Sequence, residues 1–339
     1  MATIKDVAAR AGISYTTVSH VVNNSRPVSP GVRKKVEAAI AELGYVPSGV
    51  ARSLRSRATG TFGVLVPNAV NPYFAELARG IEDHCERQGY SVILCNSDDD
   101  ADKQLRYLRV LKERRIDGLV VATVDGDPRF ARALAGLRIP LVLADRPLDG
   151  VQAAHIRIDH HQGGLLATRH LLDLGHRRIA CIGGPADSPV ASERITGYQE
   201  ALAQAGIAPG AIQRCAFTAA AGHAAARELL ARAERPTAIF AGNDTIALGV
   251  LRAAAELGLS VPGQLSVVGF DDIELSRYLY PALTTIGQSI RDLGERAAQL
   301  LLARRETVGS PSTHDIAVPR LVLRESTAAP SALETSHAP

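Results

Sequence analysis

The stretch Ser14-Tyr15-Thr16-Thr17-Val18-Ser19-His20-Val21-Val22-Asn23 decides how the first part of this chain is expected to fold. At helical spacing Val18, Val21 and Val22 share one face, which predicts a short helix that buries its valines. The other side is rich in short hydrogen-bonding side chains and has no acid: Tyr15, Thr16, Thr17, Ser19, His20 and Asn23. Such a face suits a helix lying in a DNA major groove, where short side chains read base edges. A small solvent-exposed helix is the alternative.

The residues before this stretch predict another short helix and a tight turn. Thr3 and Asp6 have the spacing of a capping box, which stabilises the first turn of a helix. Apolar side chains recur at i, i+3, i+4 and i+7 through residues 4–11, and Gly12 permits the turn that follows. Ser14 can then cap the quoted helix. Helix, glycine turn and helix together are typical of a helix-turn-helix.

A third helix and a polar linker follow. Ser29-Pro30 has the residues of a helix start, an apolar stripe runs from Val32 to Leu43, and Gly44 suits the helix end. Residues 1–46 are therefore expected to form a three-helix head. Residues 47–58 are too few and too polar for a helix that is stable alone. They are either a hinge that becomes helical on a partner or an ordinary linker.

Charge is unevenly distributed along the 339 residues. The net charge is only +3, yet residues 1–60 hold nine lysines and arginines against three acids. This head region therefore carries +6 and leaves −3 for the rest of the chain. A basic head on a mildly acidic body favours a polyanionic partner at one end of the protein. A solvated basic surface is the alternative.

The cysteines and the apolar runs indicate the compartment. Four cysteines lie far apart, without the spacing of a zinc or redox motif, so free thiols are expected: Cys85, Cys95, Cys181 and Cys215. No signal-peptide core begins the chain, and no apolar run reaches the ~20 residues of a membrane span. We expect a soluble, cytoplasmic protein.

Five motifs of the head occur together and in order: Ala2-Thr3-Ile4-Lys5-Asp6-Val7-Ala8, Ser14 to Asn23, Val28-Ser29-Pro30, Ala41-Glu42-Leu43-Gly44-Tyr45 and Ala51-Arg52-Ser53-Leu54. In sequence and spacing they resemble the head of the LacI/GalR family of transcriptional regulators. The resemblance implies that a dimer grips a palindromic operator, that Tyr15, Thr16 and His20 choose bases, and that Leu54 wedges into the operator's centre. It implies DNA contacts for a wider set: Thr3, Ser14, Tyr15, Thr16, Thr17, Ser19, His20, Asn23, Ala51, Leu54 and Arg55.

The rest of the chain alternates short apolar runs with helical stretches. The strand-like runs are 62–67, 91–95, 118–122, 141–144, 156–158, 179–183, 212–217, 238–241, 265–270, 284–287 and 316–323. Most are apolar throughout, as parallel strands covered on both faces are. The pattern predicts an α/β body of doubly wound parallel sheets, and because it occurs twice, two similar lobes.

Domain boundaries follow from this pattern. The effector-binding and dimerisation core is expected over residues 61–325, with lobe 1 at about 61–158 and 287–317 and lobe 2 at about 159–286 and 318–325. Residues 326–339 are rich in Ala, Ser, Pro and Thr, so a disordered tail is expected. This tail lacks the leucine heptads of a tetramerising segment, which favours a dimer.

Ligands of doubly wound sheets bind at the carboxyl ends of the strands. The candidate residues there are Asn68, Asn71, Tyr73, Phe74, Asp145, Arg146, Ser188, Val190, Arg194, Phe217, Asn243, Asp271, Asp272 and Gln288. Aromatic rings can cover the C–H faces of a sugar, while carboxylates and arginines bind adjacent hydroxyls. Taken singly, each residue has a plainer explanation as a packing residue, a surface ion pair or a turn cap.

The body also resembles the periplasmic sugar-binding-protein fold that the same family uses as its core, through Asn71-Pro72-Tyr73-Phe74, Asp145-Arg146, Gly242-Asn243-Asp244 and Gly269-Phe270-Asp271-Asp272 among other motifs. Within the family the pattern is closest to ribose-operon repressors. The resemblance implies effector contacts from Asn71, Tyr73, Phe74, Asp145, Arg146, Arg194, Phe217, Asn243, Asp271 and Gln288. Ser188 and Val190 stand where the purine-responsive branch has an arginine and a threonine, which speaks against a purine.

Two other classes of protein, an enzyme and a secreted sugar receptor, fit the sequence less well than a regulator. An enzyme would need a partner for Asp271-Asp272, and no phosphate-binding glycine motif follows a strand. The acidic run 98–102 suits a loop that caps the next helix better than a metal site. A secreted sugar receptor fits the body but not the basic head. The sequence therefore predicts a dimeric, non-enzymatic repressor without metal or cofactor, released from DNA by a small sugar, with ribose favoured. Co-repression, another sugar or a purine is the alternative.

Overall fold

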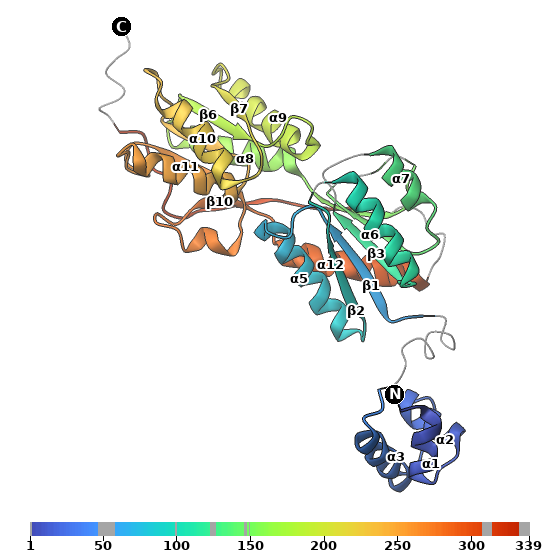
Figure 1. Cartoon of the computed structure of the whole chain (residues 1–339). Helices are drawn as coiled ribbons and strands as arrows, with labels where there is room; N and C mark the ends of the chain where they lie inside the picture. Colours follow the sequence, from blue (N-terminus) through green and yellow to red (C-terminus); the bar gives the residue numbers. More distant parts are fainter. Residues whose placement is uncertain are drawn as a thin grey trace. The chain divides into compact units, whose positions relative to one another are not determined.

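The structure is a computed structural model that describes residues 2–46, 58–98, 100–122, 127–145, 148, 150–306 and 314–331 (Figure 1). The chain divides into two compact units, a head of Met1–Gly60 and a body of Thr61–Pro339. This division agrees with the fold class expected from the sequence, a helical head followed by an α/β body.

The described residues of the head form three helices: α1 (Ile4–Ala11), α2 (Tyr15–Asn23) and α3 (Pro30–Leu43). The predicted capping box is present, because the Thr3 side chain accepts from the Asp6 amide while the Asp6 carboxylate accepts from the Thr3 amide. Gly12 ends α1 in the left-handed region at φ 63°, which glycine adopts without steric cost. The helix-turn-helix is thus confirmed.

One small apolar cluster holds these helices together. Its buried members come from all three: Val7, Val18, Val21, Val36 and Ala39. Val7, Val18 and Val36 have no exposed surface. Because so few side chains form this core, each contributes a large share of the head's stability.

Two six-stranded sheets form the body. In the first, the strand order is β11 (His314–Ala317), β5 (Ala154–Ile158), β4 (Leu141–Ala144), β3 (Gly118–Ala122), β1 (Thr61–Val66) and β2 (Ser91–Asn96), and all neighbours are parallel. In the second, it is β12 (Arg320–Val322), β10 (Thr284–Gly287), β9 (Ser266–Asp271), β8 (Ala238–Ala241), β6 (Ile179–Gly183) and β7 (Ile212–Arg214). Only β12, among these strands, pairs antiparallel.

Helices cover both faces of each sheet (Figure 1). In lobe 1, α5 (Pro72–Arg87) and α12 (Ile290–Glu306) pack together, and α6 (Ala101–Glu113) and α7 (Pro128–Ala135) contact each other. In lobe 2 the pairs are α8 (His160–Asp173) with α9 (Pro189–Gln204), and α10 (Ala219–Leu230) with α11 (Asp244–Glu256). A short 3-10 helix, η1 (Glu274–Arg277), follows β9.

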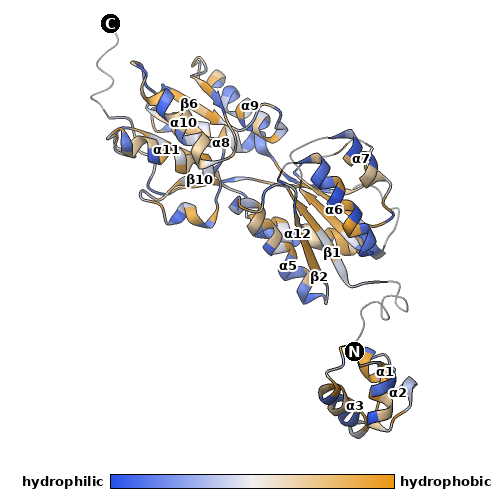
Figure 2. Cartoon of the chain, viewed as in Figure 1, coloured by the Kyte–Doolittle hydropathy of each residue, from blue (hydrophilic) through white to orange (hydrophobic). Residues whose placement is uncertain are grey.

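The buried residues of a strand alternate between the two layers. Val64 and Val66 of β1 join the cluster that contains α5 and α12, while Leu65 joins the cluster of α6 and α7. The strands are accordingly apolar throughout, and Figure 2 shows the apolar sheets between helices with hydrophilic outer sides. This is the physical reason why continuous apolar runs predicted the parallel sheets correctly.

The chain crosses between the lobes three times, after β5, after β10 and between β11 and β12. The predicted single strand 316–323 is therefore wrong, since β11 and β12 belong to different sheets. Pro319 separates them, and a proline lacks the amide hydrogen that would continue a ladder. At the crossing the Asp159 amide donates to the Ala317 carbonyl at 3.2 Å.

Two further expectations need correction. The strand predicted over 212–217 ends at Arg214, because the chain turns at Ala216 to begin α10 with Thr218 as its cap. The predicted disordered tail does not begin at residue 326. Ser326 is fully buried and its hydroxyl donates to the Val267 carbonyl at 2.6 Å. The last residues, 332–339, lie outside the described part.

We predict that Gly164→Ala destabilises the body. A Cβ at this position in α8 would lie 2.1 Å from the backbone oxygen of Arg194 in α9, so the two helices would have to separate. Overpacking of this kind costs about 1–3 kcal/mol. Urea unfolding measures the effect. Gly136→Ala is the matched control, since its nearest neighbours lie 3.5 Å away. Equal stability of the two variants would contradict the close approach.

Candidate functional site

The exposed face of α2 has the composition expected from the sequence. Val18 and Val21 are buried, whereas Tyr15 is 53% exposed and Thr16 is exposed as well. Ser14 caps the helix by accepting from the Thr17 amide at 3.2 Å. The backbone of α2 is therefore fixed from its first turn, and this orients the side chains beside the cap.

Some predicted DNA-contacting residues are held by bonds within the head. Asn23 donates its amide to the Ser19 carbonyl at 2.8 Å. The Nδ1 atom of His20 lies 2.9 Å from the Ser25 hydroxyl, which fixes the ring of His20. The Thr3 hydroxyl is engaged in the capping box. Ala51, Leu54 and Arg55 lie outside the described residues.

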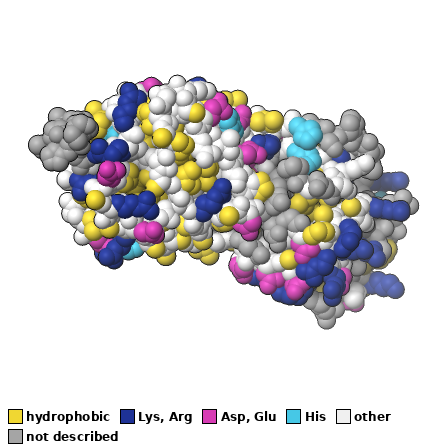
Figure 3. Space-filling view, turned by 90° about the horizontal axis from the view of Figure 1, so that it is seen from above, with side chains coloured by type: hydrophobic (Ala, Val, Ile, Leu, Met, Phe, Trp, Pro, Cys, Tyr) yellow, Lys and Arg dark blue, Asp and Glu magenta, His cyan; other side chains and the backbone are white. Residues whose placement is uncertain are grey.

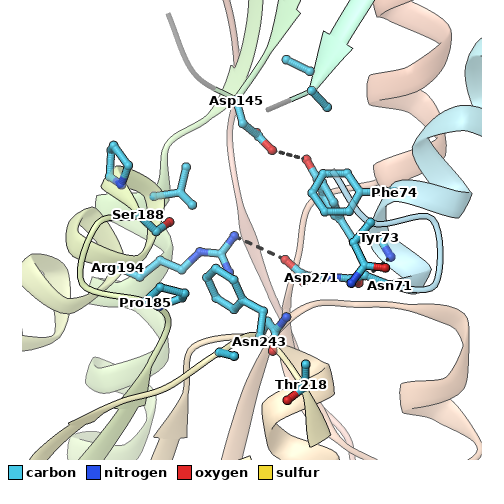
Figure 4. A pocket seen from close by; sticks show the side chains of 17 residues that line it. Asn71, Tyr73, Phe74, Asp145, Pro185, Ser188, Arg194, Thr218, Asn243 and Asp271 are labelled. Carbon is cyan, nitrogen blue, oxygen red and sulfur yellow. Dashed lines mark hydrogen bonds and ion pairs between the residues drawn. The ribbon is translucent and has the colours of Figure 1, made fainter. Parts of the chain in front are cut away.

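A cavity of about 180 Å³ lies between the two lobes of the body (Figure 4). Its lining includes eight of the ten residues expected to contact an effector: Asn71, Tyr73, Phe74, Asp145, Arg194, Phe217, Asn243 and Asp271. Most of them stand at the carboxyl ends of strands or at the helix starts that follow, as the doubly wound sheets require. Arg146 lies outside the described residues. Gln288 does not line the cavity but contacts a residue that does.

Lobe 1 contributes an aromatic wall and a carboxylate. Asn71 caps α5 through the Tyr73 amide, which places Tyr73 and Phe74 at the mouth of the cavity with their rings edge to face at 5.0 Å. The Tyr73 hydroxyl donates to Asp145 Oδ2 at 2.6 Å. Burial, together with Asp145, raises the pKa of the Tyr73 phenol well above its ordinary value, so this hydroxyl keeps its proton.

Lobe 2 contributes a buried arginine on α9. The guanidinium of Arg194 donates to the Gly242 carbonyl at 2.5 Å and lies 3.7 Å above the Phe270 ring. Its Nη2 is 3.4 Å from Asp271 Oδ1 (Figure 4). Because an arginine remains charged and its side chain is only 7% exposed, this wall presents a fixed cation to the cavity.

Asp271, the last residue of β9, is held from two sides. The Gln288 amide donates at 2.6 Å to Asp271 Oδ1, the same oxygen that Arg194 contacts. Burial raises the pKa of the Asp271 carboxyl to about 7, even though Arg194 acts in the opposite direction. Its neighbour Asp272 points elsewhere and pairs with Arg324. Only the first of the two adjacent acids is therefore part of the cavity.

We predict that Asp271→Asn raises the melting temperature of the body much more at pH 8 than at pH 4. The folded-state pKa of about 7 exceeds the ordinary value of 3.8, so the protonated carboxyl is the stabilising form. That stability is complete below about pH 4 and is lost as the pH rises through about 7. Asparagine does not ionise and therefore avoids this loss of stability. Each kcal/mol of unfolding free energy that is retained raises the melting temperature by roughly 2–4 °C. Calorimetric melting at both pH values measures it, and an equal shift at both contradicts the linkage.

Phe217 and Asn243 complete the lobe 2 side. Gly184 lies under the Phe217 ring, since a Cβ there would meet the ring at 2.1 Å. Asn243 caps α11 by accepting from the Ile246 amide at 2.8 Å, and its side chain also lines the cavity. Phe217 and Phe74 thus come from different lobes, an arrangement that suits a flat ring with two apolar faces.

Sequence reasoning missed several apolar residues that line the cavity and two polar residues at or beside it. Thr218 lines it as the cap of α10, and its place directly after Phe217 could have indicated this. His160 contacts Arg194 from behind the cavity. His160 begins α8, far along the chain from Arg194 and in another lobe from Asp145. No sequence motif singled it out.

The described part of the chain holds no group of metal-ligand side chains and no membrane-spanning helix. Within the described ranges no three histidine, cysteine, aspartate or glutamate residues are grouped as metal ligands. None of the described helices is long and apolar enough to cross a membrane.

Asp100 caps α6 through the Lys103 amide, which agrees with the interpretation of the acidic run as a capping loop. Figure 3 shows acidic and basic side chains interspersed over the face viewed from above.

Comparisons with known proteins agree with both parts of the chain. Residues 3–48 match the model of bacterial regulatory proteins of the lacI family, and residues 168–327 match a periplasmic binding protein-like domain. The Escherichia coli ribose operon repressor is 44% identical over 308 residues, covering 90% of this chain and 93% of that one. The chain belongs to the lacI family. The HTH-type transcriptional repressor PurR of Aliivibrio salmonicida is 41% identical over 307 residues, covering 90% of this chain and 92% of that one.

Solved structures of the lacI family share this architecture. The lac repressor dimer, bound to operator and the anti-inducer ONPF, is 32% identical with a TM-score of 0.87, covering 97% of this chain and 99% of that one. A LacI-family regulator from Enterococcus faecium with bound ribose is 35% identical with a TM-score of 0.72, covering 80% and 100%. This lacI-family chain is accordingly a transcriptional repressor and not an enzyme.

Proposed function

We propose that the chain binds a palindromic operator as a homodimer and is released when a small sugar, with ribose favoured, binds between its lobes. The observation that carries the sugar assignment is the cavity itself. Aromatic side chains from both lobes surround three ionisable groups held in place, Asp145, Arg194 and Asp271. Charges of both signs at hydrogen-bonding distance from a small ring are the usual partners of adjacent hydroxyls.

Two similar proteins support ribose as the sugar. The ribose operon repressor is named for a ribose operon, and the Enterococcus faecium structure contains ribose. We therefore take ribose as the first effector to test. The described cavity, at about 180 Å³, favours a single small ring over a larger saccharide.

A purine is the second candidate, because several relatives of similar identity are named PurR. Ser188 and Val190 line the cavity, however, and neither carries a charge. The Ser188 hydroxyl accepts from the Ala191 amide as the cap of α9. That wall is therefore short of groups to pair with the polar edge of a base, which favours the sugar.

The proposed DNA interface is the exposed side of α2. Tyr15, Thr16 and His20 would read base edges in the major groove, and the head's positive charge would bind phosphates. The segment 47–58, with Ala51, Leu54 and Arg55, stays a prediction from the sequence as a hinge helix that grips the operator's centre. Two heads related by the dimer axis would read the two half-sites.

We predict that His20→Ala relaxes the choice of base at one position in each half-site. Its ring is held by Ser25, so it would meet a single base edge, and losing such a contact costs about 1–3 kcal/mol of discrimination. Binding is compared across operators that differ at single positions. Arg26→Ala is the control. Removing a side chain that contributes only positive charge should weaken binding to every operator variant equally. Equal losses for His20→Ala on every operator would show that His20 does not read bases.

Calorimetric titration of the full-length protein tests the effector. Ribose, other pentoses, hexoses and purines are titrated in turn. Saturable heat with ribose alone supports the proposal, while heat with a purine alone replaces the sugar by a purine. Salt-dependent DNA binding is tested separately, because it depends on the head and not on the cavity.

A further inference from the structure

His160 is a buried histidine that touches the proposed effector site without lining it. It is the first residue of α8, directly after the chain crosses from lobe 1 to lobe 2. Only 1% of it is exposed. Its two ring nitrogens face different lobes, Nδ1 toward Arg194 and Nε2 toward Asp145.

The partner of Nδ1 determines the protonation state of the ring. Arg194 places Nε and Nη2 each 3.3 Å from Nδ1. A guanidinium has only donors, so Nδ1 must be the acceptor and carries no proton. The neutral ring therefore bears its hydrogen on Nε2. Burial and the charge of Arg194 both lower the pKa of His160, which agrees with a neutral ring.

The hydrogen on Nε2 points toward the opposite lobe. Asp145 Oδ1 lies 3.5 Å from Nε2, at the limit of hydrogen-bonding distance, and no other described residue bonds to Nε2. The second oxygen of Asp145 is occupied by the Tyr73 hydroxyl. A series of polar groups thus runs from Tyr73 through Asp145 and His160 to Arg194. His160 is the member behind the cavity, and it connects the Asp145 side with the Arg194 side.

We infer that His160 is a positioning residue: it holds the Arg194 guanidinium through Nδ1 and faces the Asp145 carboxylate of the other lobe through its Nε2 hydrogen. The inference rests on the proposed function, because it assumes that Arg194 and Asp145 bind the effector. Without the Nδ1 acceptor the Arg194 guanidinium loses one of its fixed contacts and can leave the geometry that a sugar hydroxyl requires. His160 touches no effector atom itself.

A purely packing role makes a different prediction. The ring of His160 lies 5.9 Å from that of Phe270, so an apolar side chain of similar size would preserve such a contact. The side chain of asparagine, by contrast, can place an oxygen near the Nδ1 position although it is smaller. Leucine and asparagine therefore separate the two roles.

The first test is ribose titration of the full-length protein and of two variants, His160→Asn and His160→Leu. We expect His160→Leu to bind ribose roughly 10- to 100-fold more weakly, as expected when a charged donor is left without its acceptor. His160→Asn should stay within about threefold of the parent, because the acceptor for Arg194 is restored. Equal affinity for both variants, high or low, would overturn the positioning role. Melting curves verify that both variants are folded.

The second test does not depend on the effector. Protein labelled with ¹⁵N at histidine is used to compare the ring nitrogen shifts of His160, assigned by their loss in His160→Asn. At pH 7 we expect an unprotonated Nδ1 and a protonated Nε2. A proton on Nδ1 would overturn the inference even if ribose binds. If the parent protein binds no ribose but the expected tautomer is found, the proposed effector fails and the contact that positions Arg194 stands.

Discussion

Asp271→Asn is expected to weaken effector binding by roughly 10- to 150-fold. Asp271 is the only acid at the end of β9 that lines the cavity, and it is fixed by Arg194 and Gln288. A carboxylate that accepts from sugar hydroxyls forms charge-assisted hydrogen bonds, and loss of one such bond costs about 1.5–3 kcal/mol. Titration calorimetry of the parent and the variant at pH 8 measures the loss.

The control for this variant is the neighbouring acid. Asp272 pairs with Arg324 and accepts from the Ser276 hydroxyl, away from the cavity. Asp272→Asn should therefore lower the melting temperature while leaving the effector affinity nearly unchanged. Since Asp271→Asn is expected to stabilise the body above pH 7, the two variants should change stability in opposite directions, and only Asp271→Asn should lower the effector affinity. Retention of full affinity in Asp271→Asn would remove this carboxylate from the site.

Val18→Ala is expected to weaken operator binding by roughly 10- to 100-fold without changing effector affinity. Val18 has no exposed surface and lies at the centre of the head's apolar cluster. Removing its two methyl groups costs about 2–3 kcal/mol, including the cavity that remains. A core this small rarely supplies more than ~3–5 kcal/mol, so a large fraction of the heads would unfold. Fluorescence anisotropy with labelled operator measures the loss.

The same substitution at an exposed position is the matched control. Val46 is 75% exposed, so Val46→Ala should leave the head folded and operator binding within about twofold. Calorimetric titration with the effector should give the same affinity for both variants, because the cavity belongs to the other unit. A fall in effector affinity for Val18→Ala would contradict the independence of the two units.

Patterns that depend on local chemistry predicted the structure best. The capping box at Thr3 and Asp6, the glycine that ends α1 and the valine face of α2 are each determined by neighbouring residues. The strands of the body were found because burial on both faces makes them apolar throughout. Most of the candidate effector-binding residues line the cavity for a related reason, since the carboxyl ends of parallel strands meet along one edge.

The features that the sequence did not predict depend on contacts between distant segments. Ser326 is ordered by the Val267 carbonyl, and nothing in the composition of the last residues indicates that bond. β12 joins the second sheet because the chain crosses over at Pro319. His160 reaches Arg194 only when α8 packs against α9. Such pairings depend on tertiary packing, which overrides local preference.

In the proposed mechanism, a sugar bound between the lobes controls DNA binding by the head. The most direct test is the affinity of the full-length protein for its operator, selected by the protein from a random DNA pool, without ribose and with saturating ribose. We expect ribose to weaken operator binding at least tenfold, and operator DNA to weaken ribose binding by the same factor. Operator affinity that ribose leaves unchanged, or strengthens, would contradict it.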